Sequence, residues 1–195
     1  IDNIIKAIRS VIKQEKEGPI ALHEPCFNGK EWKYVKDCIV STWVSYVGKY
    51  VDRFEEMIAD FTGVKKAVAV VNGTAALQIA LKLAGVKPGD EVLVPALTFV
   101  ATANAVVHCG AIPHFVDSEE KTLGIDPHKL KDYLNEICKV KTDECVNKVT
   151  GRRIKAIIPM HAFGHPVDLD PLMDVSLENK LEVIEDAAES LGSFY

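Results

Sequence analysis

The feature that most constrains the fold is a regular alternation of short apolar segments with helical segments, which begins near Lys66. The apolar segments are four or five residues long, and the segments between them repeat their apolar residues with a helical period. This rhythm predicts strand 67–71, helix 74–84, strand 91–94, helix 99–109, strand 112–116, helix 127–138, strand 154–158, helix 169–177 and strand 181–184. Such alternation is typical of an α/β fold with three layers, in which helices cover a mainly parallel sheet.

Three further helices are predicted ahead of this region, at 1–14, 30–42 and 51–61. The loop between the last two, 43–48, combines aromatic, hydroxyl and small side chains. We therefore divide the chain into residues 1–62, with the N-terminal helices and a substrate or dimer loop, and residues 63–195, which start a larger ligand-binding domain. The polar stretch 139–153 interrupts the rhythm and is predicted to be an exposed excursion.

Composition excludes several classes of protein. A chain of 195 residues with 48% hydrophobic residues can bury one α/β core. A formal net charge of −5 argues against binding to nucleic acid, which requires a basic face. The apolar stretches are too short to span a membrane, which takes about 20 residues. Five widely spaced cysteines without a Cys-x-x-Cys pair fit a reducing, cytoplasmic setting.

A carboxylate follows the last predicted strand. Asp186 comes two residues after the end of the short apolar run 181–184, inside the phrase Glu185–Ser190. A carboxylate just past a buried strand must be paired, hydrogen-bonded or directed at a ligand, because an unpaired charge there costs several kcal/mol, on the order given for desolvated ions. The residues alone leave the cation that it meets open.

Gly73 and Thr74 lie between the predicted strand 67–71 and helix 74–84. The start of a helix presents free N–H groups and partial positive charge, so a phosphate can bind there without a lysine. The alternative is plain helix capping by Asn72 and Thr74. The chain contains neither Gly-x-Gly-x-x-Gly after the first strand nor Gly-x-x-x-x-Gly-Lys-Ser/Thr, which disfavours dinucleotide and P-loop sites.

Phe99 follows the strand predicted at 91–94, where a flat ring could stack on it. The alternative is that Phe99 packs between helix and sheet, as isolated aromatic residues commonly do. Phosphate, flat ring and protonatable ring nitrogen occur together in pyridoxal phosphate. A carboxylate such as Asp186 beside the pyridine nitrogen would favour its protonated, electron-accepting form.

The sequence resembles a known family over essentially its whole length. The resemblance is to the DegT/StrS-type sugar aminotransferases of pyridoxal-phosphate fold type I, and it rests on the phrases Asn72-Gly-Thr-Ala-Ala-Leu, Lys87-Pro-Gly-Asp-Glu-Val-Leu-Val-Pro, Thr98-Phe-Val-Ala-Thr and Glu185-Asp-Ala-Ala-Glu-Ser. It is closest to enzymes that aminate 4-keto nucleotide sugars for legionaminic acid or bacillosamine synthesis, from Leu22-His-Glu-Pro, Ser41-Thr-Trp-Val-Ser and Met160-His-Ala-Phe-Gly-His-Pro. The implied fold is the first part of the large domain of fold type I.

The resemblance implies a role for each matching cofactor residue. Gly73 and Thr74 would bind the phosphate of pyridoxal phosphate, Phe99 would stack on its ring, and Asp186 would pair with its ring nitrogen. Glu189 would lie near the cofactor hydroxyl, where many relatives carry Gln or His, so its detailed role stays open.

Substrate residues are predicted in two loops. Trp43 and Ser45 offer stacking surface and a hydroxyl, although docking of the N-terminal arm explains Trp43 equally well. His161 would line the cofactor pocket, and the alternative is a hydrogen-bonded loop histidine. A metal site built from His161, His165 and Asp168 is disfavoured because a glycine and a proline interrupt the helix that it would need.

The implied reaction moves an amino group, from glutamate, to the keto carbon of a 4-keto-6-deoxy nucleotide sugar, in a homodimer. The Schiff-base lysine of the family lies in a Ser-x-x-Lys segment beyond the strand that carries the aspartate, whereas Tyr195 is only nine residues past Asp186. We therefore expect the lysine beyond Tyr195, no catalytic lysine in the present stretch, and no activity from this stretch alone. The alternative is a non-catalytic module that binds pyridoxal phosphate or a nucleotide and lacks the lysine.

Overall fold

The computed structural model describes residues 1–12 and 25–194. The chain forms two compact units, Ile1–Ala69 and Val70–Tyr195, which are described separately below. The predicted end of the first helix near Gln14 and residues 22–24 of the Leu22-His-Glu-Pro phrase lie outside the described residues.

The first unit contains three helices close to their predicted positions. They are α1 (Asp2–Val11), α2 (Glu31–Ser41) and α3 (Lys49–Thr62). Helix α3 ends where Gly63 adopts φ +72°, a left-handed conformation that glycine accepts without steric cost. None of the three helices buries a residue.

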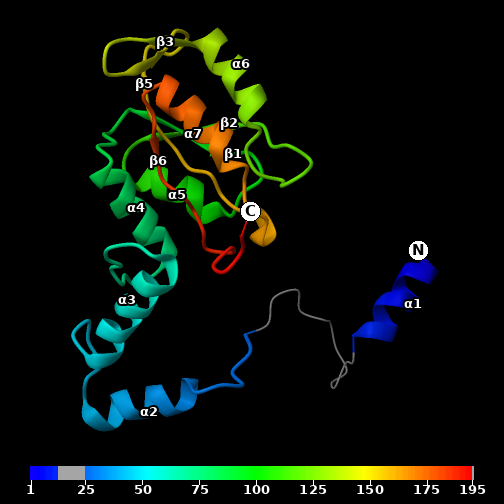
Figure 1. The fold of residues 1–195 in the computed structure, drawn as a ribbon, viewed down its shortest axis with the longest axis vertical. Coiled ribbons are helices and arrows are strands. Elements are labelled where there is room, and N and C mark those ends of the chain that lie inside the picture. Colours follow the sequence, from blue (N-terminus) through cyan, green and yellow to red (C-terminus); the bar gives the residue numbers. More distant parts are fainter. Residues whose placement is uncertain (13–24, 195) are drawn as a thin grey trace. The chain divides into compact units, whose positions relative to one another are not determined.

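The second unit is built on a mixed, mostly parallel sheet (Figure 1). Its strands are β1 (Glu91–Pro95), β2 (Ile112–Val116), β3 (Cys138–Val140), β4 (Cys145–Asn147), β5 (Arg153–Ile157) and β6 (Glu182–Val183). Strand β1 pairs in parallel with β2 on one side and β5 on the other. The far edge of β5 is shared, since antiparallel β4 pairs with its first half and parallel β6 with its second.

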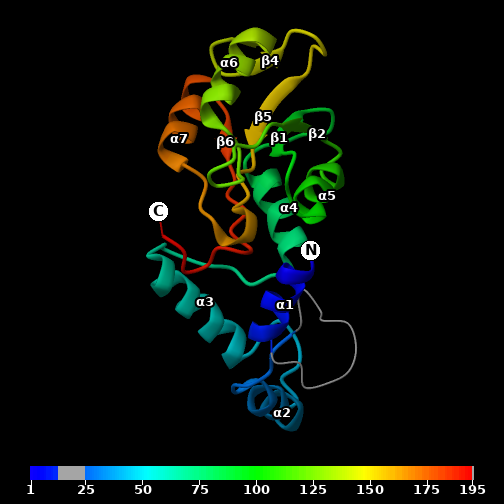
Figure 2. The ribbon, with the colours of Figure 1, turned by 90° about the vertical axis from the view of Figure 1, so that its right-hand side faces the viewer.

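Helices cover both faces of this sheet, as Figure 2 shows. Helices α4 (Gly73–Leu83) and α5 (Val100–His108) lie on one face, and α6 (Pro127–Ile137) and α7 (Leu169–Glu178) on the other. Successive side chains of β1 point to opposite faces of the sheet and so contribute to both layers. Val92 and Val94 pack with the α4–α5 side, whereas Leu93 packs with the α6–α7 side. The predicted three-layer α/β fold is therefore confirmed.

One predicted strand is wrong. Residues 67–71 form no strand, and Val68 and Val71 are 78% and 87% exposed. The amide of Ala69 donates to Glu55 Oε1 (2.7 Å) and not to a neighbouring strand. Apolar, β-branched residues favour extended backbone, but a strand also needs a partner for its N–H and C=O groups, and the described part of the chain supplies none for this segment.

The polar stretch 139–153 was wrongly expected to be only an exposed excursion. It forms most of the β3–β4 hairpin, which extends the sheet and buries Cys145 and Asn147. The last predicted strand also differs, because β6 has only two paired residues, of which Glu182 is exposed and Val183 half-buried. It is an edge strand in the described structure and not a buried one.

Two further observations concern the chemistry of the chain. All five cysteines carry free thiols. No helix among residues 1–12 and 25–194 is long and apolar enough to cross a membrane.

Candidate active site

Asp186 lies at the carboxyl end of the parallel strands. It forms a bridge with Met160, just beyond β5, in which its amide donates to Pro159 O (2.8 Å) and its carbonyl oxygen accepts from the His161 amide (3.3 Å). Ligands of open α/β sheets bind outside this end of the strands. The backbone thus places Asp186 where a ligand site is expected.

The Asp186 carboxylate is buried and lacks a cationic partner. Its side chain accepts from Thr102 Oγ1 at 2.7 Å and from the Ala188 amide at 3.3 Å, and the residue is only 7% exposed. Among the described residues, no lysine, arginine or histidine forms an ion pair with it. A buried carboxylate in this setting favours a cation supplied from outside the described chain.

Thr102 links the start of α5, where Phe99 lies, to Asp186. Phe99 caps the start of α5, and its carbonyl oxygen accepts from the Thr102 amide one turn later (3.1 Å). The Phe99 side chain is 63% exposed, so it does not pack between helix and sheet as the alternative required. Its ring is free to contact a flat ligand at the strand end. Thr102 was not among the predicted site residues.

The start of α4 keeps two free N–H groups. Asn72 Oδ1 accepts from the Ala75 amide (2.9 Å), so the capping alternative is correct for Asn72 and not for Thr74. The amides of Gly73 and Thr74 have no acceptor within the described residues, and no atom lies within 4 Å of where a Gly73 side chain would begin. Together with the helix dipole, these amides suit an anion. Helices α4 and α5 lie side by side on one face of the sheet (Figures 1 and 2).

His161 has partners for both ring nitrogens. Its Nδ1 accepts from the Val167 amide (3.0 Å), which leaves the ring proton on Nε2, 2.7 Å from Glu185 Oε1. The residue is 2% exposed. This arrangement matches the hydrogen-bonded loop histidine that the sequence left open. No group of three or more His, Cys, Asp or Glu side chains in the described residues could hold a metal.

Glu189 holds the turn that follows His161. Its Oε2 accepts from the Phe163 amide (2.7 Å) in the short 3₁₀ helix η1 (Ala162–Gly164). Phe163 has φ +55°, an unusual value for a residue other than glycine, and its ring is 67% exposed. Sequence reasoning missed this turn, since nothing local marks Phe163 as left-handed beyond the glycine after it.

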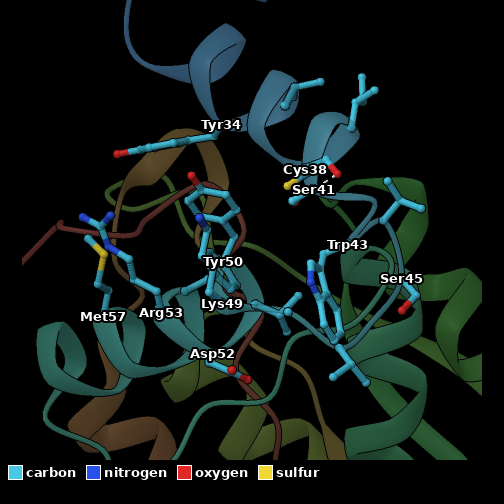
Figure 3. Close-up of a pocket in the computed structure, with 17 residues that line it drawn as sticks. Tyr34, Cys38, Ser41, Trp43, Ser45, Lys49, Tyr50, Asp52, Arg53 and Met57 are labelled. Carbon is cyan, nitrogen blue, oxygen red and sulfur yellow. Dashed lines mark hydrogen bonds between the residues drawn. The ribbon is translucent and has the colours of Figure 1, made fainter.

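Trp43 and Ser45 line a cavity within the first unit. It has a volume of about 1030 Å³ and lies between α2, α3 and the loop that joins them (Figure 3). Tyr34 and Tyr50 line it too, with ring centroids 4.9 Å apart. The two predicted substrate residues therefore share one aromatic-lined cavity.

Charged groups also line this cavity. Arg53 lies with its guanidinium carbon 5.9 Å from the centre of the Tyr34 ring. Lys49 pairs with Asp37 (2.6 Å), which also accepts from the Tyr50 hydroxyl (2.9 Å). Hydrogen bonds from Lys49 and Tyr50 hold the pKa of the Asp37 carboxyl below its usual range. The cavity thus combines stacking surfaces with cations.

Comparison with known proteins decides the family. Residues 25–195 match the model of the DegT/DnrJ/EryC1/StrS aminotransferase family. The chain belongs to this family. The match includes every residue predicted to bind cofactor or substrate, and it confirms the resemblance to sugar aminotransferases.

Individual members of the DegT/DnrJ/EryC1/StrS family support the same assignment. The chain is 42% identical over 176 residues to the GDP-perosamine synthase of Caulobacter vibrioides, which covers 90% of this chain and 43% of the relative. It is 38% identical over 149 residues to the UDP-2-acetamido-2-deoxy-3-oxo-D-glucuronate aminotransferase of Pseudomonas aeruginosa, covering 76% and 37%. The crystal structure of an aminotransferase from Psychrobacter cryohalolentis superposes with a TM-score of 0.72 at 34% identity, covering 86% and 39%. The chain thus spans about two fifths of the length of these family members.

Proposed function

We propose that this protein is a pyridoxal-phosphate-dependent aminotransferase that acts on a nucleotide sugar. The observation that carries the proposal is the buried Asp186 carboxylate at the carboxyl end of the strands, which has no cationic partner among the described residues and accepts a hydrogen bond from Thr102 in the first turn of α5. A protonated pyridine nitrogen is a cation of suitable shape for this position, and family membership supports the same cofactor.

The available groups fit the cofactor. The free amides of Gly73 and Thr74 would hold its phosphate, the Phe99 ring would stack on its flat face, and Asp186 would keep its ring nitrogen protonated. When bound, pyridoxal phosphate supplies an electron-accepting ring to the amino-transfer reaction. Glu189, with Oε2 on the Phe163 amide, keeps Oε1 for the cofactor hydroxyl that the family resemblance suggests.

For the substrate, we propose that Trp43 and Ser45 contact the nucleotide sugar. Their shared cavity supports this role because aromatic surfaces can stack on a nucleotide base and the Arg53 guanidinium suits a diphosphate. His161 orders the loop beside the site and does not bind the substrate through its ring nitrogens, because both nitrogens already form hydrogen bonds within the chain.

The finer identity of the reaction is also a proposal. Family resemblance suggests glutamate as donor, a 4-keto-6-deoxy sugar as acceptor and a homodimer, and the cysteine pattern suggests a cytoplasmic setting. One relative is named for a GDP sugar and another for a 3-oxo UDP sugar, so both the nucleotide and the position of the keto group need testing.

The Schiff-base lysine determines which protein to test. Lys180 cannot serve in this structure, because it is exposed in the turn between α7 and β6, with φ +59°. The relatives are more than twice as long as the matched region. The experiment therefore uses the product of the complete coding sequence, in which we expect a Ser-x-x-Lys segment after Asp186.

We expect this product to purify with a yellow absorbance that borohydride removes. With glutamate, it should convert one member of a panel of 4-keto and 3-oxo sugars linked to GDP or UDP into an amino sugar, detected by mass spectrometry. A colourless product that takes up no added pyridoxal phosphate would contradict the proposal. Binding of GDP or UDP by such a product would instead support the non-catalytic nucleotide-binding module.

A further inference from the structure

Two threonines form a hydrogen-bonded relay that ends on Asp186. Thr98 Oγ1 donates to Thr102 Oγ1 at 2.8 Å, and Thr102 Oγ1 donates to Asp186 Oδ2 at 2.7 Å. Thr102 is fully buried and Thr98 half-buried. Thr98 lies just before α5 and Thr102 in its first turn, so the bond joins the approach to the helix with the helix itself.

The direction of the relay follows from the number of hydrogens. An ionised carboxylate only accepts, so the single hydroxyl hydrogen of Thr102 must be directed at Asp186. Thr102 then has only lone pairs to offer Thr98, whose own hydrogen completes the chain. Each member polarises the next, so the bond that reaches the carboxylate is strengthened.

The relay constrains the rotation of the Asp186 carboxylate, which the backbone leaves free. The amide and carbonyl of Asp186 are fixed by Pro159 and His161, so the sheet sets where the residue sits along the strand. The rotation of its carboxylate depends on the hydrogen bonds that the carboxylate oxygens accept. Among the described residues these are the Thr102 hydroxyl and the longer bond from the Ala188 amide (3.3 Å).

We propose that Thr102 is a positioning residue, which holds the Asp186 carboxylate correctly turned toward the ring nitrogen of the cofactor, and that Thr98 keeps the Thr102 hydrogen directed at Asp186. This inference rests on the proposed function. A carboxylate accepts at about four lone-pair positions, so the bonds from Thr102 and Ala188 leave acceptor sites for the cofactor.

The test compares hydroxyl-deleting and hydroxyl-keeping variants of the complete protein. T102V removes the hydroxyl at nearly constant volume, and T102S keeps it. T98V removes only the far donor. The matched control is S176A, because Ser176 is another buried hydroxyl of the same unit that bonds within its own helix, to Leu172 O (2.8 Å), and has no link to Asp186.

The first readout is binding of pyridoxamine 5′-phosphate to the cofactor-free protein by calorimetry, which reports the non-covalent contacts without turnover. We expect T102V to weaken binding roughly 10-fold, as for the loss of one charge-assisted hydrogen bond, and T98V about 3-fold. T102S and S176A should stay within about 2-fold of the parent, since neither breaks the relay.

The second readout is amino-transfer kinetics on the sugar that the panel identifies. T102V should lower kcat roughly 10- to 100-fold with little change in the KM of the sugar, because a misplaced group slows chemistry more than substrate binding. T102S should restore most of kcat.

Three results would overturn the inference. The first is that T102V binds pyridoxamine phosphate as tightly as the parent protein does. The second is that T102V and S176A lose the same amount of affinity for it. If T102V does not fold, T98V replaces it in the test. The third result is then that T98V binds pyridoxamine phosphate as tightly as the parent protein does. A parent that binds no pyridoxamine phosphate would instead remove the proposed function itself, which separates the two failures.

Discussion

The carboxylate of Glu189 accepts a hydrogen bond from the Phe163 amide at 2.7 Å, and it thereby joins the segment after β6 to the turn after β5. Both segments leave the same end of the sheet as Asp186. Glu189 therefore has a structural task in addition to the cofactor contact that family resemblance suggests.

Replacing Glu189 tests the structural role. Glu189→Ala removes the acceptor, so we expect the Phe163 amide to exchange with deuterium about 5-fold faster, equivalent to roughly 1 kcal/mol for an exposed bond to a carboxylate. Glu189→Gln keeps an oxygen acceptor, so its Phe163 amide should exchange at a rate between those of the parent protein and Glu189→Ala. Glu182→Ala, which removes an exposed partner of Lys155, is the control and should leave this amide unchanged. Unchanged exchange in Glu189→Ala would show that the bond does not order the turn.

Phe163 itself provides a second prediction. A left-handed conformation costs a residue other than glycine about 1–2 kcal/mol, whereas glycine loses about 0.5–1 kcal/mol of extra chain entropy on folding. With φ +55° at Phe163, Phe163→Gly should therefore be more stable than Phe163→Ala by roughly 0.5–1 kcal/mol. Both variants lose the same exposed ring, so the difference reports the backbone alone. Urea unfolding measures it, and an alanine variant as stable as the glycine variant would contradict it.

Much of this fold was predictable because its signals are local. Apolar runs and helical periods located most strands and helices of the second unit. Helix α6, predicted at 127–138, begins at Pro127, and the Asp126 side chain caps it. Phe99 and Asp186 were predicted as site residues from the same local signal, since each follows a predicted strand, and the structure places both after strand ends.

The sequence predictions were wrong where the structure of a segment depends on a neighbouring segment far away in the sequence. Segment 67–71 has strand-like residues but no neighbouring strand in the described chain, whereas the polar hairpin around Asn147 becomes part of the sheet because β5 offers it an edge. Thr102 was missed because its role depends on a residue 84 positions later. The spacing of four between Thr98 and Thr102, one turn past a strand end, was the only local indication.

Glu91 forms a buried network away from Asp186, at the opposite end of β1 from Phe99. Its carboxylate accepts from Thr150 Oγ1 (2.6 Å) and Asn147 Nδ2 (2.9 Å) and lies 2.8 Å from His114 Nδ1. Burial opposes ionisation and is the largest single influence on the pKa of Glu91, but the three hydrogen bonds and the electrostatic attraction to His114 together outweigh it and lower that pKa.

This network predicts acid sensitivity. A carboxyl whose pKa is lower in the folded protein than in the unfolded chain, where it is about 4.3, adds stability above that value and loses it as the pH falls through the folded value. We expect the free energy of unfolding to fall as the pH drops below about 5, and Glu91→Gln to flatten this dependence while costing roughly 1–3 kcal/mol at pH 7. Urea unfolding between pH 3 and 7 measures both.

The control for this prediction is Glu120→Gln, which changes an exposed carboxyl and should keep the parental acid dependence. Equal slopes for Glu91→Gln and the parent would show that the ionisation of Glu91 does not stabilise the fold.

Asp186→Asn tests the central residue of the site. Asparagine keeps an oxygen that can accept from Thr102, so the free energy of unfolding should change by only about 1 kcal/mol. It carries no negative charge, so it cannot hold a ring nitrogen in its protonated form, and amino transfer should slow roughly 100-fold or more, as for loss of a key electrostatic contact. Initial rates and urea unfolding of the complete protein measure the two effects, with Asp168→Asn as an exposed control from the same unit. Parental turnover by Asp186→Asn would make Asp186 a structural residue, because a group that acts through its charge cannot be replaced by a neutral one of the same shape.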